Sequence, residues 1–524
     1  MATTPLSLEV KRDTYLAYLE HGSQRKAAKA MDVSHGTFQS RLDRISDEEK
    51  LAFEQGELGG ELDPTGIPEV SGSRFILTSA QNATAVFTPF WDNLLVLAKH
   101  YDAEIMVSRF RYNVSAQQAR QSKTDAVASA AEWYADELRQ YIHDDRVRLC
   151  DGLVWAGDMN ILPTATDPLS GMDSFTGLDS CVFPHAKIAM KSIAVAMTDA
   201  PKKNYTTGCV TLSNYIKRKA GQKAEFHHAY GALLVEIDDD GDYFCRQLNA
   251  DDEGVICDLG IRVVDGKVKP NRPAALGAGD IHARNVDPVV YDATWGKGGL
   301  VDTLNPRNQF VGDVLDFDSR SHHNDIFDNY RLHCSGGDCV ESEVQETFDC
   351  ISGILRDDIK THIKKGNHDE HMDRWLREGN FKTDLTNAPF YLEAMAAKLR
   401  AIKAKNDDFD LLEWSFDRIG GLDVEFISRN KTIVVAGIDM SQHGDMGPNG
   451  SRGSVRNLAK VGRKVNIEHS HSAHIFDGAY QAGTSTRLDM DYLRGPSSWS
   501  HVHILTHENG KRQMIEFKNG KWRG

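Results

Sequence analysis

Seven side chains that can bind metal ions fall in five short segments of the C-terminal half of the chain. They are Asp280, His282, Asp313, Asn367, His443, His469 and His471. Carboxylate, imidazole and amide ligands together favour Mn²⁺, Fe or Zn²⁺ over Ca²⁺. Asp280 and His282 are two positions apart, so on an extended chain their side chains point the same way and can hold one cation. The pattern predicts a site for divalent metal ions.

Each of the five segments follows a β-like run. AALGAG precedes Asp280, FVG precedes Asp313 and HIKKG precedes Asn367, while TIVVAGI and KVNIE precede the later histidines. A single Asp-x-His or Gly-Asp is common by chance, so the ordered set carries the prediction. Loops after the C-terminal ends of strands are where α/β folds place their chemistry. We therefore expect an α/β protein in which residues 271–524 form the domain that holds the metal site.

Three further segments precede this domain. Residues 1–50 are predicted to be helical, and residues 51–73 are rich in Glu, Gly and Pro and indicate a linker. Residues 74–270 predict a mixed α/β accessory region. It begins with a strand (RFILTSAQ), a helix (TPFWDNLLVLAKHYD) and a strand (AEIMVSRF), the order of a βαβ-like unit.

The first 50 residues predict a helix-turn-helix. A helix of small residues is followed by a tight turn, and Phe38 and Leu42 give the next helix an apolar face. Ser34 is expected to cap that second helix. Its outer face suits a DNA groove and carries His35, Gln39, Arg41 and Arg44. The alternative is a plain helical hairpin that packs on protein.

Composition limits the class of protein. The 524 residues carry a net charge of −15, which argues against wrapping nucleic acid non-specifically over the whole surface. A nuclease remains compatible, because bound cations reverse the local field. The sequence contains no run long and apolar enough for a membrane span or a signal peptide. Eight cysteines are scattered between Cys150 and Cys350, so a reducing, cytoplasmic setting is expected.

The ordered motifs resemble those of the calcineurin-like metallophosphoesterase superfamily: D-x-H, G-D-x-x-D, G-N-H-[DE], a lone His and G-H-x-H. The matching positions are Asp280-Ile-His282, Gly312-Asp313-Val-Leu-Asp316, Gly366-Asn367-His368-Asp369, His443 and His469-Ser-His471. Glu468 stands where the superfamily has glycine, which puts the local backbone in question. GDVLDFD is similar to a segment of the Mre11/SbcD-type nucleases. ILTSAQNAT and PTATDPLSG are similar to metallophosphoesterases of tailed bacteriophages, among them the host-DNA-degrading nucleases of T5-like phages.

The resemblance implies a β-sandwich flanked by helices and a site with two metal ions, most often Mn²⁺. The first ion would be held by Asp280, His282, Asp313 and His471, and the second by Asp313, Asn367, His443 and His469. Asp313 would bridge the ions, and a water between them would become the nucleophile. His368 would protonate the leaving oxygen, with Asp369 orienting its ring. Related nucleases are often dimers or larger, so a homo-oligomer is expected.

The function expected from these observations is a two-metal phosphodiester hydrolase, a DNA nuclease whose N-terminal helices bind DNA. If the gene is phage-encoded, the protein would act in the host cytoplasm. One alternative is a phosphomonoesterase or small-molecule phosphodiesterase with an N-terminal assembly domain. Another is a DNA-binding regulator that has lost catalysis, although its full ligand set argues against this.

Other histidines and a lysine are less informative. For His322, His323 and His474, solvated loop positions are favoured over the lining of a substrate channel. For Lys187, His227 and His228, a hydrogen-bonded structural core is favoured over contacts with phosphate.

Overall fold

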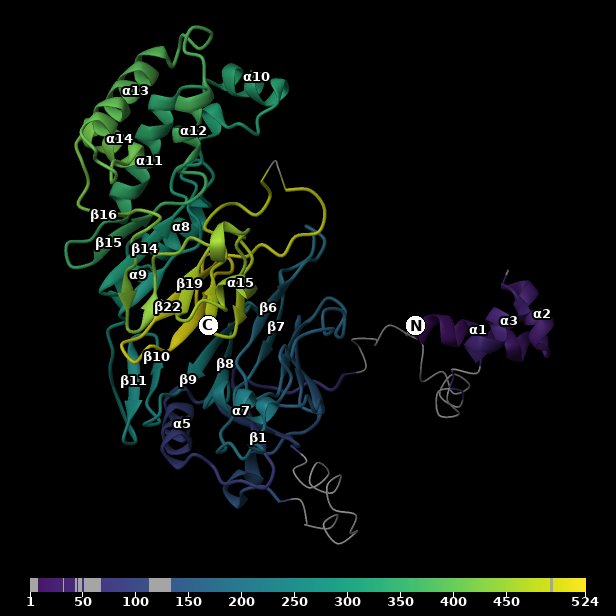
Figure 1. The fold of residues 1–524 in the computed structure, drawn as a ribbon. Coiled ribbons are helices and arrows are strands. Elements are labelled where there is room, and N and C mark those ends of the chain that lie inside the picture. The colour runs from purple at the N-terminus through teal and green to yellow at the C-terminus, as the bar shows by residue number, and fades with distance from the viewer. Residues whose placement is uncertain are drawn as a thin grey trace. The chain divides into compact units, whose positions relative to one another are not determined.

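The computed structural model describes residues 8–31, 33–42, 45, 50, 67–112, 133–490 and 493–524. The chain divides into two compact units, Met1–Ile67 and Pro68–Gly524 (Figure 1). Among the residues described, no helix has both the length and the apolar character needed to cross a bilayer.

The described residues of the smaller unit include three packed helices, α1 (Leu8–His21), α2 (Gln24–Ala30) and α3 (His35–Leu42). Ala27, Ala28 and Phe38 are buried between them. The small alanines let α2 and α3 approach closely, and the apolar spacing of α3 supplies the opposing side. The Thr37 N–H donates to Ser34 Oγ at 3.1 Å, which confirms the predicted cap of the second helix.

The larger unit begins with the predicted βαβ-like unit. Strands β1 (Arg74–Gln81) and β2 (Glu104–Phe110) pair in parallel, and α5 (Thr88–Tyr101) connects them. Strands β8 (Gly231–Ile237) and β9 (Tyr243–Asn249) complete a four-stranded sheet in the order β2-β1-β8-β9. Residues 113–132 lie outside those described, and Asp136–Tyr141 form a 3-10 helix.

A six-stranded sheet carries three of the five motif segments at its strand ends. Its order is β16-β15-β14-β13-β22-β23. The strands are β13 (Ala275–Gly277), β14 (Asn308–Gly312), β15 (Lys360–Lys364), β16 (Glu425–Ile427), β22 (Val502–Thr506) and β23 (Arg512–Glu516). The first four are parallel, and β22 and β23 form an antiparallel hairpin that turns around Asn509–Gly510.

Helices pack on one face of this sheet. They are α8 (Pro288–Trp295), α9 (Leu300–Leu304), α11 (Val340–Ile354), α12 (His371–Glu378), α13 (Ala388–Lys403) and α14 (Leu411–Ile419), whereas α10 (Ile326–Ser335) has no buried residue. Side chains of the sheet such as Val311 and Ile363 lie in one apolar cluster with Ile351, Met372 and Phe416 of the helices. Figure 1 shows the green helices α11–α14 gathered next to β15 and β16.

A ten-stranded sheet joins residues from both sides of the predicted boundary at position 270. Its order is β17-β18-β19-β21-β20-β6-β7-β5-β4-β3. The early strands are β3 (Arg146–Cys150), β4 (Leu153–Ala156), β5 (Ser180–Phe183), β6 (Met190–Ile193) and β7 (Lys202–Thr206). The late strands are β17 (Val434–Val435), β18 (Ile438–Asp439), β19 (Lys464–Ile467), β20 (His474–Phe476) and β21 (Ala479–Gln481).

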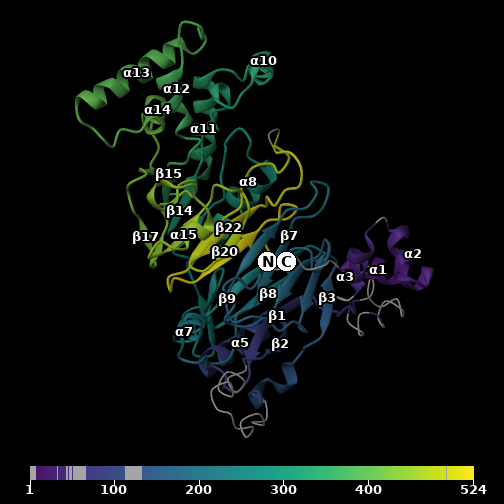
Figure 2. The same ribbon diagram turned by 45° about the vertical axis from the view of Figure 1, so that its right-hand side comes forward.

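The junction between early and late strands is an antiparallel pairing of β20 with β6, in which Ile475 lies opposite Met190. Figure 2 shows the late, yellow strands beside the early, blue ones. Each strand covers an edge that the other segment would otherwise expose. Residues on both sides of position 270 therefore belong to one compact unit, which differs from the predicted division into an accessory region and a separate domain.

The six- and ten-stranded sheets pack against each other. Ala275 and Phe310 of the first sheet share a buried apolar cluster with Ile438 of the second. The short helix α15 (Val455–Leu458) packs on β19 and β21 through another apolar cluster. The remaining elements are α7 (Lys219–Phe226), the 3-10 helices η4 (Asp318–Arg320) and η5 (Pro448–Gly450), and a sheet of β10 (Ile256–Asp258), β11 (Ile261–Val264) and β12 (Lys267–Pro270). The architecture is mixed α/β with several sheets, as the sequence predicts.

Candidate metal centre

The first group of predicted ligands consists of Asp280, His282 and His471, whose ligand atoms all lie within 4.8 Å of one another. Asp280 and His282 follow β13, whereas His471 follows β19 of the other sheet. His471 Nε2 is 3.1 Å from Asp280 Oδ2 and 3.3 Å from His282 Nε2. All three side chains are buried, so His282 and His471, which are 189 positions apart in the chain, converge on one interior point.

The second group consists of Asp313, His443 and His469, again within 4.8 Å of one another. His443 Nε2 lies 3.0 Å from Asp313 Oδ2. Asp313 also lies within 4.8 Å of His282, and the His469 N–H donates to Asp280 Oδ2 at 2.9 Å. Asp313 therefore stands between the two groups, in the position predicted for a shared ligand.

Asn367 is held next to Asp313 by its neighbours in the chain. The His368 N–H donates to Asp313 Oδ1 at 3.0 Å. A Cβ atom on Gly366 would collide with the same carboxylate, which explains the glycine at that position. Asn367 Oδ1 and Asp280 Oδ1 are buried, and neither has a hydrogen-bond partner among the described residues. Buried polar atoms are normally satisfied, so these oxygens fit a bound cation.

Four of the predicted ligands adopt a left-handed backbone conformation. The φ angles are +44° at His282, +42° at Asp313, +75° at His469 and +57° at His471. This conformation is uncommon for residues other than glycine, and strained residues of this kind cluster at functional sites. Four such conformations among the seven predicted ligands support a ligand-binding role.

The site attracts positive charge. Burial by itself would raise the pKa of Asp313, but the nearby imidazoles of His443 and His368 hold it well below its usual range. Conversely, burial opposes protonation of His443, yet the carboxylates of Asp313 and Asp280 raise its pKa to about 9. Carboxylates that draw protons onto neighbouring imidazoles would equally draw divalent cations.

His368 lies at the edge of the centre and is more exposed to solvent than the predicted ligand His443. Its side chain is 24% exposed, against 0% for His443. Its Nδ1 is 2.8 Å from Asp316 Oδ1, and the same oxygen lies 3.1 Å from His282 Nδ1. Asp316 thus positions both a predicted ligand and the predicted acid, a role the sequence analysis did not assign.

The predicted role of Asp369 is wrong in one respect, because Asp369 does not orient His368. Its carboxylate accepts hydrogen bonds from the Gly366 N–H at 2.9 Å and the Leu315 N–H at 3.1 Å. Asp369 is therefore committed to closing the loops that carry Asp313 and Asn367, whereas Asp316 lies beside the His368 ring.

Glu468, the departure from the motif, contributes its side chain to the centre. The carboxylate is fully buried and pairs with the equally buried Lys364 of β15. Its Oε2 lies 3.8 Å from His443 Nδ1. Burial and the neighbouring Asp280 charge raise the pKa of Glu468 to about 7, against the opposing charge of Lys364. The sequence signal was a charged residue in place of glycine together with a lysine two positions before Gly366.

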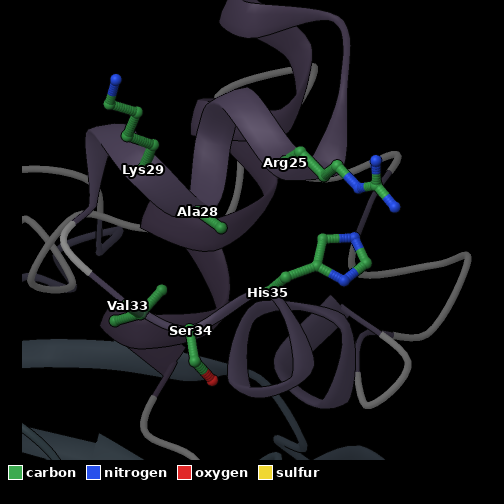
Figure 3. A pocket seen from close by; sticks show the side chains of 6 residues that line it. All are labelled: Arg25, Ala28, Lys29, Val33, Ser34 and His35. Atoms are coloured by element: carbon green, nitrogen blue, oxygen red, sulfur yellow. The ribbon is translucent and has the colours of Figure 1, made fainter.

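The smaller unit presents most of its predicted DNA-binding residues to solvent. His35 and Gln39 are exposed and Arg41 is partly exposed, while Arg44 lies outside the described residues. A pocket between α2 and α3 is lined by Arg25, Ala28, Lys29, Val33, Ser34 and His35. Figure 3 shows the Arg25 and His35 side chains next to each other at one end of this pocket.

Two of the less informative residues fit the structural alternative. Lys187 pairs with Asp477 and donates to Thr166 O at 2.6 Å. Both ring nitrogens of His228 are within 2.8 Å of a hydrogen-bond partner, Tyr215 Oη and Thr211 O.

The fold and the centre define a mixed α/β protein with a histidine- and aspartate-rich candidate metal site. The chain is 38% identical to "Protein A1" of Escherichia phage T5 over 468 residues, which span 86% of this chain and 83% of that protein. It belongs to the same family as this phage protein. No protein-family model matches the chain, and no solved structure matches it.

Proposed function

We propose that the protein is a two-metal-dependent phosphodiester hydrolase that degrades DNA in the cytoplasm of a phage-infected host. One observation carries the proposal: Asp313 lies between two ligand groups, Asp280/His282/His471 and His443/His469. A shared carboxylate between two sets of imidazoles is the ligand pattern of a two-metal phosphoesterase site.

The residues present fit two divalent ions of the Mn²⁺ class. Asp280, His282 and His471 would hold one ion, Asn367, His443 and His469 the other, and Asp313 both. Two such ions, when bound, would supply positive charge for a phosphate and would lower the pKa of a water nucleophile. The buried Oδ1 atoms of Asp280 and Asn367, which have no hydrogen-bond partner in the described part of the chain, support this assignment.

His368 is assigned the proton transfer to the leaving oxygen. Its Nδ1 faces Asp316, which leaves Nε2 as the ring nitrogen for the substrate. Burial opposes protonation, but the hydrogen bond to Asp316 and the charge of Asp313 raise the pKa of His368 to about 10. The ring is therefore protonated near neutral pH in the metal-free protein, as a general acid requires.

DNA is proposed as the substrate because of the smaller unit and the phage relative. Arg25, Lys29 and Arg41 are cationic side chains of α2 and α3, and His35 lies with Arg25 and Lys29 at one pocket. Exposed cations and polar side chains on a short helix can contact phosphates and base edges. We assign the DNA contact to this unit.

The test is a substrate panel with metals varied. Purified protein should degrade linear, circular or single-stranded DNA with Mn²⁺ and stop on addition of EDTA. Hydrolysis of bis-p-nitrophenyl phosphate with no action on any nucleic acid would overturn the DNA assignment and favour a small-molecule phosphodiesterase. Inertness toward every phosphoester under all divalent metals would overturn the proposal as a whole.

The DNA contact is tested separately by binding. The double variant His35→Ala/Arg41→Ala should bind a fluorescent DNA duplex more weakly and with a shallower salt dependence. The matched control is Lys405→Ala, which removes an exposed cation from the larger unit. Equal weakening in both variants would contradict a specific role for the helices.

A further inference from the structure

A second histidine cluster lies beside the proposed centre and contains none of its seven ligands. His322 and His323 belong to the loop after η4, and His371 is the first residue of α12. One ring nitrogen from each residue lies within 4.8 Å of the other two. Two separate segments of the chain therefore bring three imidazoles to one point.

The rings of the three histidines are tightly grouped. The ring centroids are 3.8 Å apart for His322 and His323, 4.6 Å for His322 and His371, and 5.8 Å for His323 and His371. No carboxylate belongs to this group. Three imidazoles with an open fourth position are a ligand set of Zn²⁺, and imidazole ligands in general select transition metals over Mg²⁺ or Ca²⁺.

One of the three histidines is buried and two are exposed, which fits a site that is open to solvent on one side. His371 is 8% exposed, and its buried Nδ1 has no hydrogen-bond partner among the described residues. His322 and His323 are exposed. A buried nitrogen without a partner needs an explanation, and a bound ion reached from solvent through the two exposed rings provides one.

We infer that His322, His323 and His371 form a third transition-metal site, suited to Zn²⁺ and distinct from the two-metal centre. The ring of His371 lies 4.7 Å from that of His368, centroid to centroid. An ion held by three imidazoles keeps a coordination position for water or an anionic substrate oxygen. Its place next to His368 would let it bind a phosphate oxygen of the substrate outside the two-metal centre.

The test measures metal content rather than activity. Full-length protein is stripped with a chelator, loaded with Zn²⁺, freed of excess ion by gel filtration and analysed by mass spectrometry of the metal. The parent should retain three ions per chain and His322→Ala/His323→Ala should retain two. The control His333→Ala removes an exposed histidine outside the cluster and should retain three. Equal metal content in the parent and the double variant would overturn the inference.

A spectroscopic measurement on a single variant gives a second test in case the double variant does not fold. With Co²⁺ as the probe, the parent should show more visible d–d absorption than the single variant His322→Asn. The control His333→Ala should absorb as strongly as the parent. Identical spectra would contradict the site. The result is independent of the proposed activity, because an inert protein that binds three ions would uphold this inference while refuting the proposed function.

Discussion

Two buried clusters of charged side chains in the larger unit differ in how their carboxylates are neutralised. At Arg246, the guanidinium contacts Asp258 at 2.6 Å and also pairs with Glu236, which Arg74 contacts at 3.2 Å. At the candidate metal centre, the ion-pair partners of Asp280, Asp313 and Asp316 among the described residues are imidazoles.

Lys364 does not neutralise these carboxylates, because it is paired with Glu468. A buried carboxylate is costly unless a cation or hydrogen bonds compensate it. The Arg246 cluster is complete within the protein, so it serves the fold. The metal centre is complete only when its imidazoles are protonated or when divalent ions bind. Buried charge alone therefore does not indicate function. Buried carboxylates that the cationic side chains of the protein do not neutralise indicate a site for a cationic ligand.

The largest effect is expected from Asp313→Asn, which removes the carboxylate shared by both proposed ion sites. Loss of several kcal/mol of charge stabilisation corresponds to a fall of about 10⁴-fold in kcat/KM. Metal content should also fall. Hydrolysis of DNA and mass spectrometry of the metal measure the two effects. Asp239→Asn, an exposed position between β8 and β9, should behave as the parent, and retained activity in the Asp313 variant would refute the shared-ligand role.

His368→Ala should lower kcat for DNA by about 10³-fold, as expected for loss of a general acid, and should leave the metal content unchanged. The loss should be smaller for bis-p-nitrophenyl phosphate, because p-nitrophenolate leaves without protonation. His100→Ala, exposed on α5, is the matched control. Loss of metal in the His368 variant would instead make it a ligand.

Arg246→Ala tests the other cluster. It removes the cation that pairs with the buried Asp258 and leaves Glu236 with Arg74 alone, so it should lower the free energy of unfolding by about 3–5 kcal/mol. Metal content of the folded protein should not change. Denaturant unfolding gives the value, with the exposed pair variant Arg139→Ala expected at 0–1 kcal/mol as the control. If the loss of unfolding free energy in Arg246→Ala depended on bound metal, the two clusters would not differ in the way described.

Removal of metal should make stability fall as pH rises. The folded-state pKa of His443 is about 9, raised above the unfolded value by Asp313 and Asp280 despite burial. Its contribution is therefore complete below about pH 6.5 and lost as pH rises through about 9, by on the order of 3 kcal/mol. Metal-bound protein should show the opposite trend, since ligand imidazoles must be neutral. Thermal melts with and without EDTA test this, and parallel curves would count against it.

The smallest effect is expected from Glu468→Gln, which weakens the negative charge near His443 Nδ1. Outer partners of metal ligands typically change affinity by at least about tenfold. Competition with a chromophoric chelator measures this, with the exposed Glu378→Gln as control. Unchanged affinity would make the Lys364–Glu468 pair purely structural.

The sequence predicted local elements better than their assembly. The β1–α5–β2 unit follows from alternating and helical apolar patterns between residues 74 and 110. The pairing of β20 with β6 does not, because Ile475 and Met190 are far apart in the chain and neither strand shows which edge it will cover. Contacts across position 270 therefore could not be predicted from local patterns.

The same limit applies to the centre. The superfamily resemblance implied that Asp280 and His471 share one ion, and their side chains lie together although they follow strands of two different sheets. The contact of His368 with Asp316 depends on how the loop after β14 folds, whereas the superfamily resemblance had implied Asp369 as the residue that orients His368. From the sequence, Glu468 indicated only a change in the local backbone. Its pairing with Lys364 could not be predicted, because Lys364 lies on another strand.

The most direct test of the central claim is an anomalous-diffraction map of crystals grown with Mn²⁺. The account predicts two strong peaks about 3.5–4 Å apart, one beside Asp280, His282 and His471 and one beside Asn367, His443 and His469, with Asp313 between them. A map with one peak or none at these residues would contradict it.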